Sequence, residues 1–214
     1  MPLVRSKDRK VTNAVSPNGK TPTIANTFGL PSGKAYSCPG ATSVCEKVCY
    51  AGKLEKVYKG VKDVLLNNWE QLRNADQLQM EALLYQMIDE FDKDCVKRNA
   101  EKLFRIHWDG DFFNETYTHA WKNVIKAFPA IQFWVYTRSA FAVPILGDVD
   151  NLSLYFSTDD DNWQLASELK RDNGVKLAYL ANNFAMGKER MLKISVKSAI
   201  PCPENAKKLP LISD

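Results

Sequence analysis

Three cysteines lie within twelve residues of one another: Cys38, Cys45 and Cys49. Clustered thiolates are the ligands that soft metals and iron–sulfur clusters prefer in proteins. Cys45 and Cys49 are four residues apart, so on a helix their sulfur atoms share one face, and Cys38 comes from a preceding Pro-Gly loop. A closed zinc site takes four ligands, whereas three cysteines leave one iron of a [4Fe–4S] cluster open. The triad therefore predicts an iron–sulfur cluster, with zinc as the alternative.

The other two cysteines differ in context. Cys95 belongs to an apolar helical stripe, which indicates a thiol of the hydrophobic core. Cys202 stands between two prolines near the end of the chain and is a candidate fourth ligand of the cluster, as are an aspartate and solvent. An odd number of cysteines, three of them clustered, fits metal binding better than a disulfide framework.

Composition limits the classes of protein that the chain can represent. Its 214 residues are 45% hydrophobic and 25% charged, which is ordinary for a single globular domain spanning 1–214. The net charge of +4 permits a nucleic-acid or phosphorylated partner without requiring one. The N-terminus lacks the apolar segment of a signal peptide, and no apolar run is long enough to span a bilayer. We therefore expect a cytoplasmic protein without membrane contact, in which thiols stay reduced.

Hydrophobic periodicity divides the chain into segments. Residues 1–35 form an N-terminal extension with a first strand at 23–28, residues 36–60 form the cluster-binding loop, and residues 198–214 form a C-terminal tail. Helical spacing follows at 61–72 and 80–95. From residue 102, strands at 103–108, 131–136, 152–157, 175–180 and 192–196 alternate with helices at 115–127 and 163–171, a looser segment at 139–148 and a turn-rich stretch at 181–190. This order predicts an α/β fold with about six β/α units, as a partial (β/α)6-type barrel or a strongly curved parallel sheet.

Most of the predicted strands have one polar face. In the strand at 103–108, Phe104 and Ile106 point to the face opposite Arg105 and His107, and the strands at 131–136, 152–157 and 192–196 alternate in the same way. If the apolar faces pack on helices, the polar faces converge on an interior that suits a ligand better than a core. Ligands of such folds bind at the carboxyl ends of the strands. Those ends carry Asp109, Gly110, Asp111, Arg138 and Ser157.

With these residues in place, the chain resembles the radical S-adenosylmethionine (SAM) superfamily. More closely, it resembles bacteriophage-encoded proteins that have a cysteine triad ending in Cys-Tyr-Ala and a strand ending in an Asp-Gly-Asp-like turn. Cys49, Tyr50 and Ala51 match the first motif and residues 109–111 the second. The spacing departs from the superfamily's common one: six and three residues separate these cysteines, instead of three and two.

The resemblance implies a cofactor and a set of roles. Cys38, Cys45 and Cys49 would bind a [4Fe–4S] cluster whose open iron chelates SAM. Asp109, Gly110 and Asp111 would receive the methionine amino group, and Arg138 and Ser157 would contact the ribose or the carboxylate. An enzyme of this type needs an electron donor. If the chain is phage-encoded, its compartment is the host cytoplasm.

Two other side chains are candidates for catalysis on their own chemistry. Tyr136 can stack on a base or gate a radical, and His107 can act as an acid or base, although a buried hydrogen-bonded histidine is the commoner outcome. Arg138 can clamp a carboxylate or simply pair with a nearby aspartate. Lysines at 53, 56, 59 and 62 form either a solvated helix face or a phosphate-binding edge. The main alternative to an enzyme is a non-catalytic cluster protein with a protein-derived fourth ligand, acting as a redox or nucleic-acid-associated module.

Overall fold

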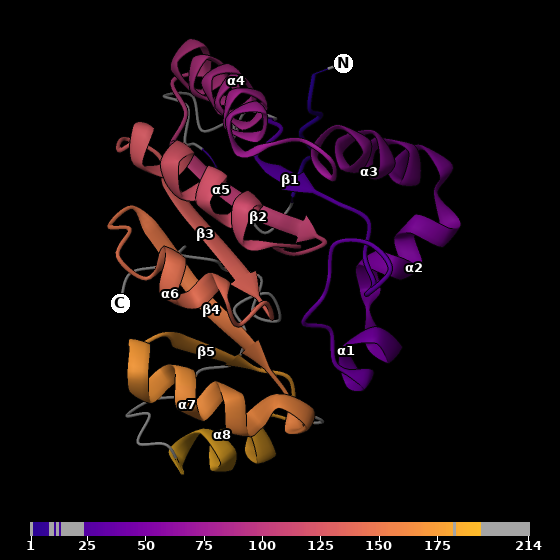
Figure 1. The fold of residues 1–214 in the computed structure, drawn as a ribbon, viewed down its shortest axis with the longest axis vertical. Coiled ribbons are helices and arrows are strands. Elements are labelled where there is room, and N and C mark those ends of the chain that lie inside the picture. The colour runs from indigo at the N-terminus through magenta and orange to yellow at the C-terminus, as the bar shows by residue number, and fades with distance from the viewer. Residues whose placement is uncertain (1, 9–10, 12, 14–23, 182, 194–214) are drawn as a thin grey trace.

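The computed structural model describes residues 2–8, 11, 13, 24–181 and 183–193. Five strands form one sheet in the order β1 (Thr27–Gly29), β2 (Leu103–Asp109), β3 (Gln132–Thr137), β4 (Leu152–Thr158) and β5 (Lys176–Tyr179). Each strand pairs in parallel with the next one along the chain. Right-handed crossovers between consecutive parallel strands all pass over the same face, so the connecting helices collect on one side of the sheet (Figure 1).

The helices fall into two groups. α4 (Gln77–Arg98), α5 (Glu115–Ala127), α6 (Ala142–Leu146) and α7 (Trp163–Asn173) cover the sheet, followed by α8 (Phe184–Leu192). α1 (Ser43–Val48), α2 (Tyr50–Val57) and α3 (Lys59–Leu72) lie beside the sheet, and the arrowheads of β2, β3 and β4 point toward the segment that contains α1 (Figure 1). The segment that contains Cys45 and Cys49 therefore lies at the carboxyl ends of these strands. No described helix combines the length and the apolar character needed to cross a membrane.

The predicted α/β class with parallel strands is confirmed, and four of the six predicted strands match β2 to β5 closely. The described sheet is an open one of five strands, with β1 and β5 as its outer members. The strand predicted at 192–196 is wrong at its start, because Leu192 ends α8, and residues 194–196 lie outside the described residues. The stretch at 181–190, predicted as turns, instead contains most of α8, which Asn183 caps by accepting a hydrogen bond from the Met186 N–H.

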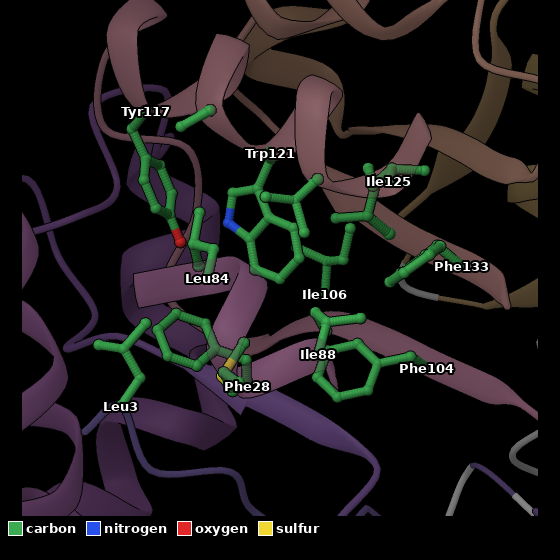
Figure 2. Packing of buried hydrophobic residues seen from close by; sticks show 14 of the residues in the cluster. Leu3, Phe28, Leu84, Ile88, Phe104, Ile106, Tyr117, Trp121, Ile125 and Phe133 are labelled. Atoms are coloured by element: carbon green, nitrogen blue, oxygen red, sulfur yellow. The ribbon is translucent and has the colours of Figure 1, made fainter. Parts of the chain in front are cut away.

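The main core lies between the sheet and the α4–α5 layer. Trp121 of α5 is fully buried and is surrounded by apolar side chains from β1, β2 and α4 (Figure 2). α5 begins where Asn114 accepts a hydrogen bond from the Tyr117 N–H, and its buried residues recur at helical spacing toward Phe104 and Phe133. Cys95 is fully buried in the same cluster, which confirms that it is a core thiol.

A bulge in β2 changes the face on which His107 lies. Thr27 pairs with Arg105 and Gly29 with Asp109, so three residues of β2 lie opposite one residue of β1. His107 has a left-handed φ of 59°, and its ring packs among Phe112, Tyr117 and Trp121 on the helical side of the sheet. The strict alternation predicted along β2 is therefore wrong beyond Ile106. Instead of joining the polar face, His107 belongs to the core.

We expect His107 to make folding sensitive to acid. Burial, followed by the charge of Arg105, lowers its pKa from 6.5 to about 3. Because the folded pKa lies below the unfolded one, this contribution to stability is complete above pH 6.5 and is lost as the pH falls toward 3. The metal-free chain should lose on the order of 4 kcal/mol over that interval through this residue alone. Urea unfolding at stepped pH measures the effect.

His107→Asn is the matched variant, because asparagine tolerates the left-handed backbone. It lowers stability at neutral pH, but its unfolding free energy should change much less between pH 6.5 and pH 3 than that of the parent chain. Parallel pH profiles for the two proteins would show that His107 does not titrate differently on folding.

Candidate functional site

The cysteine loop is attached to the carboxyl end of β2. The Leu30 N–H donates to the carbonyl of Asp109 at 3.0 Å, and the Asp111 N–H donates to the Ser37 hydroxyl at 3.3 Å. Gly110 has a φ of 78°, and a Cβ atom there would come within 2.5 Å of the Ser37 Oγ atom. The Asp-Gly-Asp turn and the residues before Cys38 are thus built against each other.

A second group of contacts fixes the start of α1 against β3 and β4. Thr42 caps α1 by accepting from the Cys45 N–H at 3.1 Å, and its hydroxyl donates to the Asp159 carboxylate at 2.6 Å. The Arg138 guanidinium donates to the same carboxylate at 2.7 Å and to Thr42 at 3.2 Å. Both charged side chains are almost fully buried. This buried ion pair orients the helix that carries Cys45. It also shows that Arg138 pairs with a nearby aspartate, which was one of the two roles expected for it.

Cys49 does not continue the helix that contains Cys45. It is the C-cap of α1 and the N-cap of α2, with φ −54° and ψ 108°. Its sulfur accepts a hydrogen bond from the Gly52 N–H at 3.3 Å. The prediction that both sulfurs lie on one face of a single helix is therefore wrong. Cys45 lies within α1, whereas Cys49 lies between α1 and α2 and has a non-helical backbone conformation. N–H donors to sulfur are a recurring feature of iron–sulfur sites, where they tune the cluster.

The thiols lie close to acidic groups. Burial and then the Asp111 carboxylate raise the pKa of Cys38, to which Asp109 adds a smaller increase. Burial is also the main cause of the raised pKa of Cys45, which Arg138 lowers and Cys49 and Asp111 raise. Asp111 is thus a common neighbour of Cys38 and Cys45. A positive charge at this position would stabilise the thiolates, as a bound metal does.

The two aspartates of the turn have different environments. Asp111 is saturated: it accepts from the Phe112 N–H at 2.7 Å, the Thr137 hydroxyl at 2.6 Å and the Arg138 N–H at 2.7 Å. Burial nevertheless raises its pKa to about 6. Because these donors lie in the turn itself, at the last residue of β3 and at the residue that follows it, Asp111 acts as a clamp between the ends of β2 and β3.

Asp109 keeps one oxygen available. Its Oδ1 accepts from the Gly110 N–H at 2.9 Å, whereas its buried Oδ2 receives no described N–H donor. Asp109 also shares a hydrogen bond with the neighbouring Glu55 carboxyl group. Burial and then the nearby Glu55 carboxylate raise the pKa of Asp109 to about 8. Glu55, on α2, is oriented by the Ser32 N–H, which donates to it at 2.9 Å. Two carboxyl groups in this position attract a cation or share a proton.

Glu55 was not among the residues singled out from the sequence. The sequence did contain a sign of its role, because Glu55 is the one carboxylate within the lysine-rich stretch 53–62. In the structure it is half-buried, whereas the lysines around it are exposed. Tyr50 was quoted only as part of a motif. In the structure its hydroxyl donates to the Trp108 carbonyl at 3.1 Å and so joins α2 to β2.

The other predicted site residues are distributed along the sheet. Tyr136 and Ser157 lie half-buried on the face away from α5 and α7, where the rings of Trp134, Tyr136 and Tyr155 follow one another at 5.2 and 5.3 Å. His107 is separated from them by the sheet. The structure therefore brings together Cys38, Cys45, Cys49, Asp109, Asp111 and Arg138, and it places His107 in the core.

The donor set fits an iron–sulfur cluster in its chemistry. Within the described ranges, no three His, Cys, Asp or Glu side chains meet closely enough to bind a single metal ion. A cubane binds each cysteine at a different iron atom, so its ligands need not meet at one point. Cys202, the proposed alternative ligand, lies outside the described residues.

We expect Gly40→Ala to displace the cysteine loop. A Cβ atom at Gly40 would lie 2.1 Å from the carbonyl oxygen of Arg138, which is backbone and cannot rotate away. Overpacking of this kind typically costs roughly 1–3 kcal/mol. The free energy of unfolding measured with urea should decrease, and so should the amount of iron bound after anaerobic reconstitution.

Gly60→Ala is the control for this variant. No atom lies within 4 Å of the added methyl group, and the position is helical, so the change is expected to be neutral or to stabilise α3 by up to about 1 kcal/mol. Equal stability and equal iron content in the two variants would contradict the close packing of the loop on β3.

Comparison with known proteins identifies similar phage proteins. The family model described as "Gene product 88" matches residues 1–214. A "Gene 88 protein" of Mycobacterium phage L5 is 52% identical over 217 residues, covering 99% of this chain and 88% of that protein. A "Gene 88 protein" of Mycobacterium phage D29 is 52% identical over 207 residues, covering 94% of this chain and 84% of that protein. No solved structure matches.

Proposed function

The chain belongs to the Gene product 88 family of phage-encoded proteins, and we propose that it binds a [4Fe–4S] cluster through Cys38, Cys45 and Cys49. One observation carries the proposal. Three thiols come from a loop, a helix and a helix cap at the carboxyl edge of one parallel sheet, where Asp111 is a neighbour of both Cys38 and Cys45 and Cys49 is a neighbour of Cys45.

The local contacts support a bound cluster rather than free thiols. Burial and nearby carboxylates disfavour the thiolate of Cys38, which costs free energy unless a cation compensates it. The Gly52 N–H donates to Cys49, and Arg138 lowers the pKa of Cys45. The N–H donor stabilises negative sulfur at Cys49, and the Arg138 charge offsets part of the burial that raises the pKa of Cys45.

The same site has properties that suit SAM. Its amino group is a cation, and Asp109 offers a buried oxygen without a described N–H donor, next to the second carboxyl group of Glu55. The aromatic and polar face that carries Tyr136 and Ser157 begins at the same edge and suits a ligand containing a base and a ribose. A singly wound parallel sheet with helices on one face is also the wall expected of a partial barrel.

On this proposal each residue has a defined task. The cysteines would bind the cluster, Asp109 would accept a hydrogen bond from the SAM amino group and could take up the proton that this group releases on chelation, and Asp111 positions the turn by clamping β2 to β3. Arg138 orients α1 through Thr42 and Asp159. When reduced, a cluster with one open iron supplies the electron that cleaves SAM.

Electron paramagnetic resonance (EPR) tests the enzyme reading. The anaerobically purified, dithionite-reduced chain should show a cluster signal that changes when SAM is added. 5′-Methylthioadenosine, which lacks the amino and carboxylate groups that chelate iron, is the control ligand. A cluster signal unchanged by SAM would reject SAM chelation while leaving the cluster in place.

Asp109 also favours a second candidate function. The same available oxygen can bind the fourth iron directly, which gives a closed, non-catalytic cluster for a redox or nucleic-acid-associated role. The two readings differ in what Asp109 contacts, so substitution of this one residue separates them.

A further inference from the structure

A basic surface lies beside the cysteine site, on α1, α2 and the start of α3. We call it the lysine edge and define it by five exposed lysines: Lys47, Lys53, Lys56, Lys59 and Lys62. None of them forms an ion pair with a described carboxylate. Elsewhere, by contrast, Lys93, Lys102, Lys122 and Lys126 each pair with an aspartate. The positive charge of the lysine edge is therefore uncompensated within the described part of the chain.

The same segment has few acidic residues on its surface. Glu55 points inward to Ser32 and Asp109, so it does not neutralise the surface. Glu46 and Asp63 are the exposed carboxylates of residues 43–63. A row of unpaired lysines with little acid between them attracts a polyanion such as a phosphate backbone.

An aromatic side chain projects from the middle of this row. Tyr58 is 57% exposed at the junction where α2 ends and α3 begins, with Lys56 and Lys59 on either side. Exposed aromatics between lysines are how proteins stack the bases of a single strand while they track its backbone. Among the aliphatic side chains of α2, Ala51 is buried and Leu54 is half-buried, so Val57 alone projects from this helix. A single exposed valine is a small apolar face for a bilayer, so a membrane surface suits the lysine edge less well.

We propose that the lysine edge binds single-stranded nucleic acid, with Lys53, Lys56, Lys59 and Lys62 contacting phosphates and Tyr58 stacking on a base. In Figure 1 this edge continues from the segment that carries Cys45 and Cys49, so a strand bound here passes next to the cysteine site. The inference does not depend on the cluster, because none of these residues contributes to the triad.

Fluorescence anisotropy with a labelled oligothymidylate of about 16 nucleotides tests the proposal. Substituting the four lysines with glutamine should weaken binding on the order of a hundredfold at 0.1 M salt and reduce the slope of log K against log salt by about 3. Tyr58→Ala should weaken binding roughly tenfold without changing the salt slope. Both variants should retain the iron content of the parent chain.

The control removes the same charge elsewhere. Lys7, Lys97, Arg98 and Lys188 are exposed and form no ion pair with a described carboxylate, and their replacement by glutamine should leave affinity within about twofold, because exposed charges more than a Debye length apart are screened. Equal loss of binding in both quadruple variants would reduce the effect to net charge and overturn the proposal. Tighter binding to a duplex of the same length, or to phosphatidylserine vesicles, would overturn it as well.

Discussion

Replacing Cys38, Cys45 or Cys49 by alanine is expected to abolish cluster binding, whereas Cys95→Ala leaves it intact. Removing one thiolate leaves two protein ligands for a cubane, which is too few to retain it at the edge of a sheet. Iron and sulfide content, together with the visible absorption that dithionite bleaches, measure the loss in anaerobically purified protein. Each triad variant should fall close to background.

Cys95→Ala is an informative control because it removes the same thiol group as the triad variants do, but from the hydrophobic core. Cys95 is fully buried in the core, where its Sγ donates to the Glu101 carbonyl at 3.7 Å. Burial raises its pKa to about 11, so it remains a thiol at neutral pH. Far-UV circular dichroism establishes that all four variants fold. Retention of the cluster in a folded Cys49→Ala variant would remove Cys49 from the ligand set.

Asp109→Asn is expected to preserve the cluster and to weaken its response to SAM. The substitution keeps the shape of the side chain and removes the carboxyl group that can ionise when a cationic ligand binds, while Glu55 alone remains. A charge-assisted hydrogen bond of this kind contributes roughly 1.5–3 kcal/mol. SAM affinity, measured through the change in the EPR signal, should therefore fall by at least about tenfold.

Asp150→Asn serves as the charge-matched control, since Asp150 is exposed and lies outside the site. The outcome of the Asp109 substitution decides between the two functions. Loss of iron in Asp109→Asn would make this aspartate the fourth ligand of a closed cluster and would reject the SAM reading. An unchanged SAM response would place the ammonium group elsewhere.

Regular elements could be predicted from the sequence because their signals are local. The residues of α5 carry both an Asn114 cap and a complete helical stripe, and the predicted range 115–127 matches the helix. The alternation of β3 and β4 placed Phe133 and Phe156 in the core and Tyr136 on the opposite face, as the structure has them. In each case neighbours in the chain determine the outcome.

Features that depend on contacts between residues far apart in the chain could not be predicted from the sequence. The bulge that turns His107 into the core arises from the register of β2 against β1, which lie far apart in the chain. The helix break at Cys49 and the inward position of Glu55 depend on how α2 packs on β2 and Ser32. The distinction between a saturated Asp111 and an available Asp109 likewise requires the positions of Thr137 and Arg138.

The most direct test of the central claim is the metal content of the anaerobically purified chain, measured with Mössbauer spectroscopy of the iron-57-labelled protein. We expect iron and sulfide in the ratio of a [4Fe–4S] cluster, with one iron site distinct from the other three because it lacks a cysteine ligand. A colourless protein that contains stoichiometric zinc and no sulfide would contradict it.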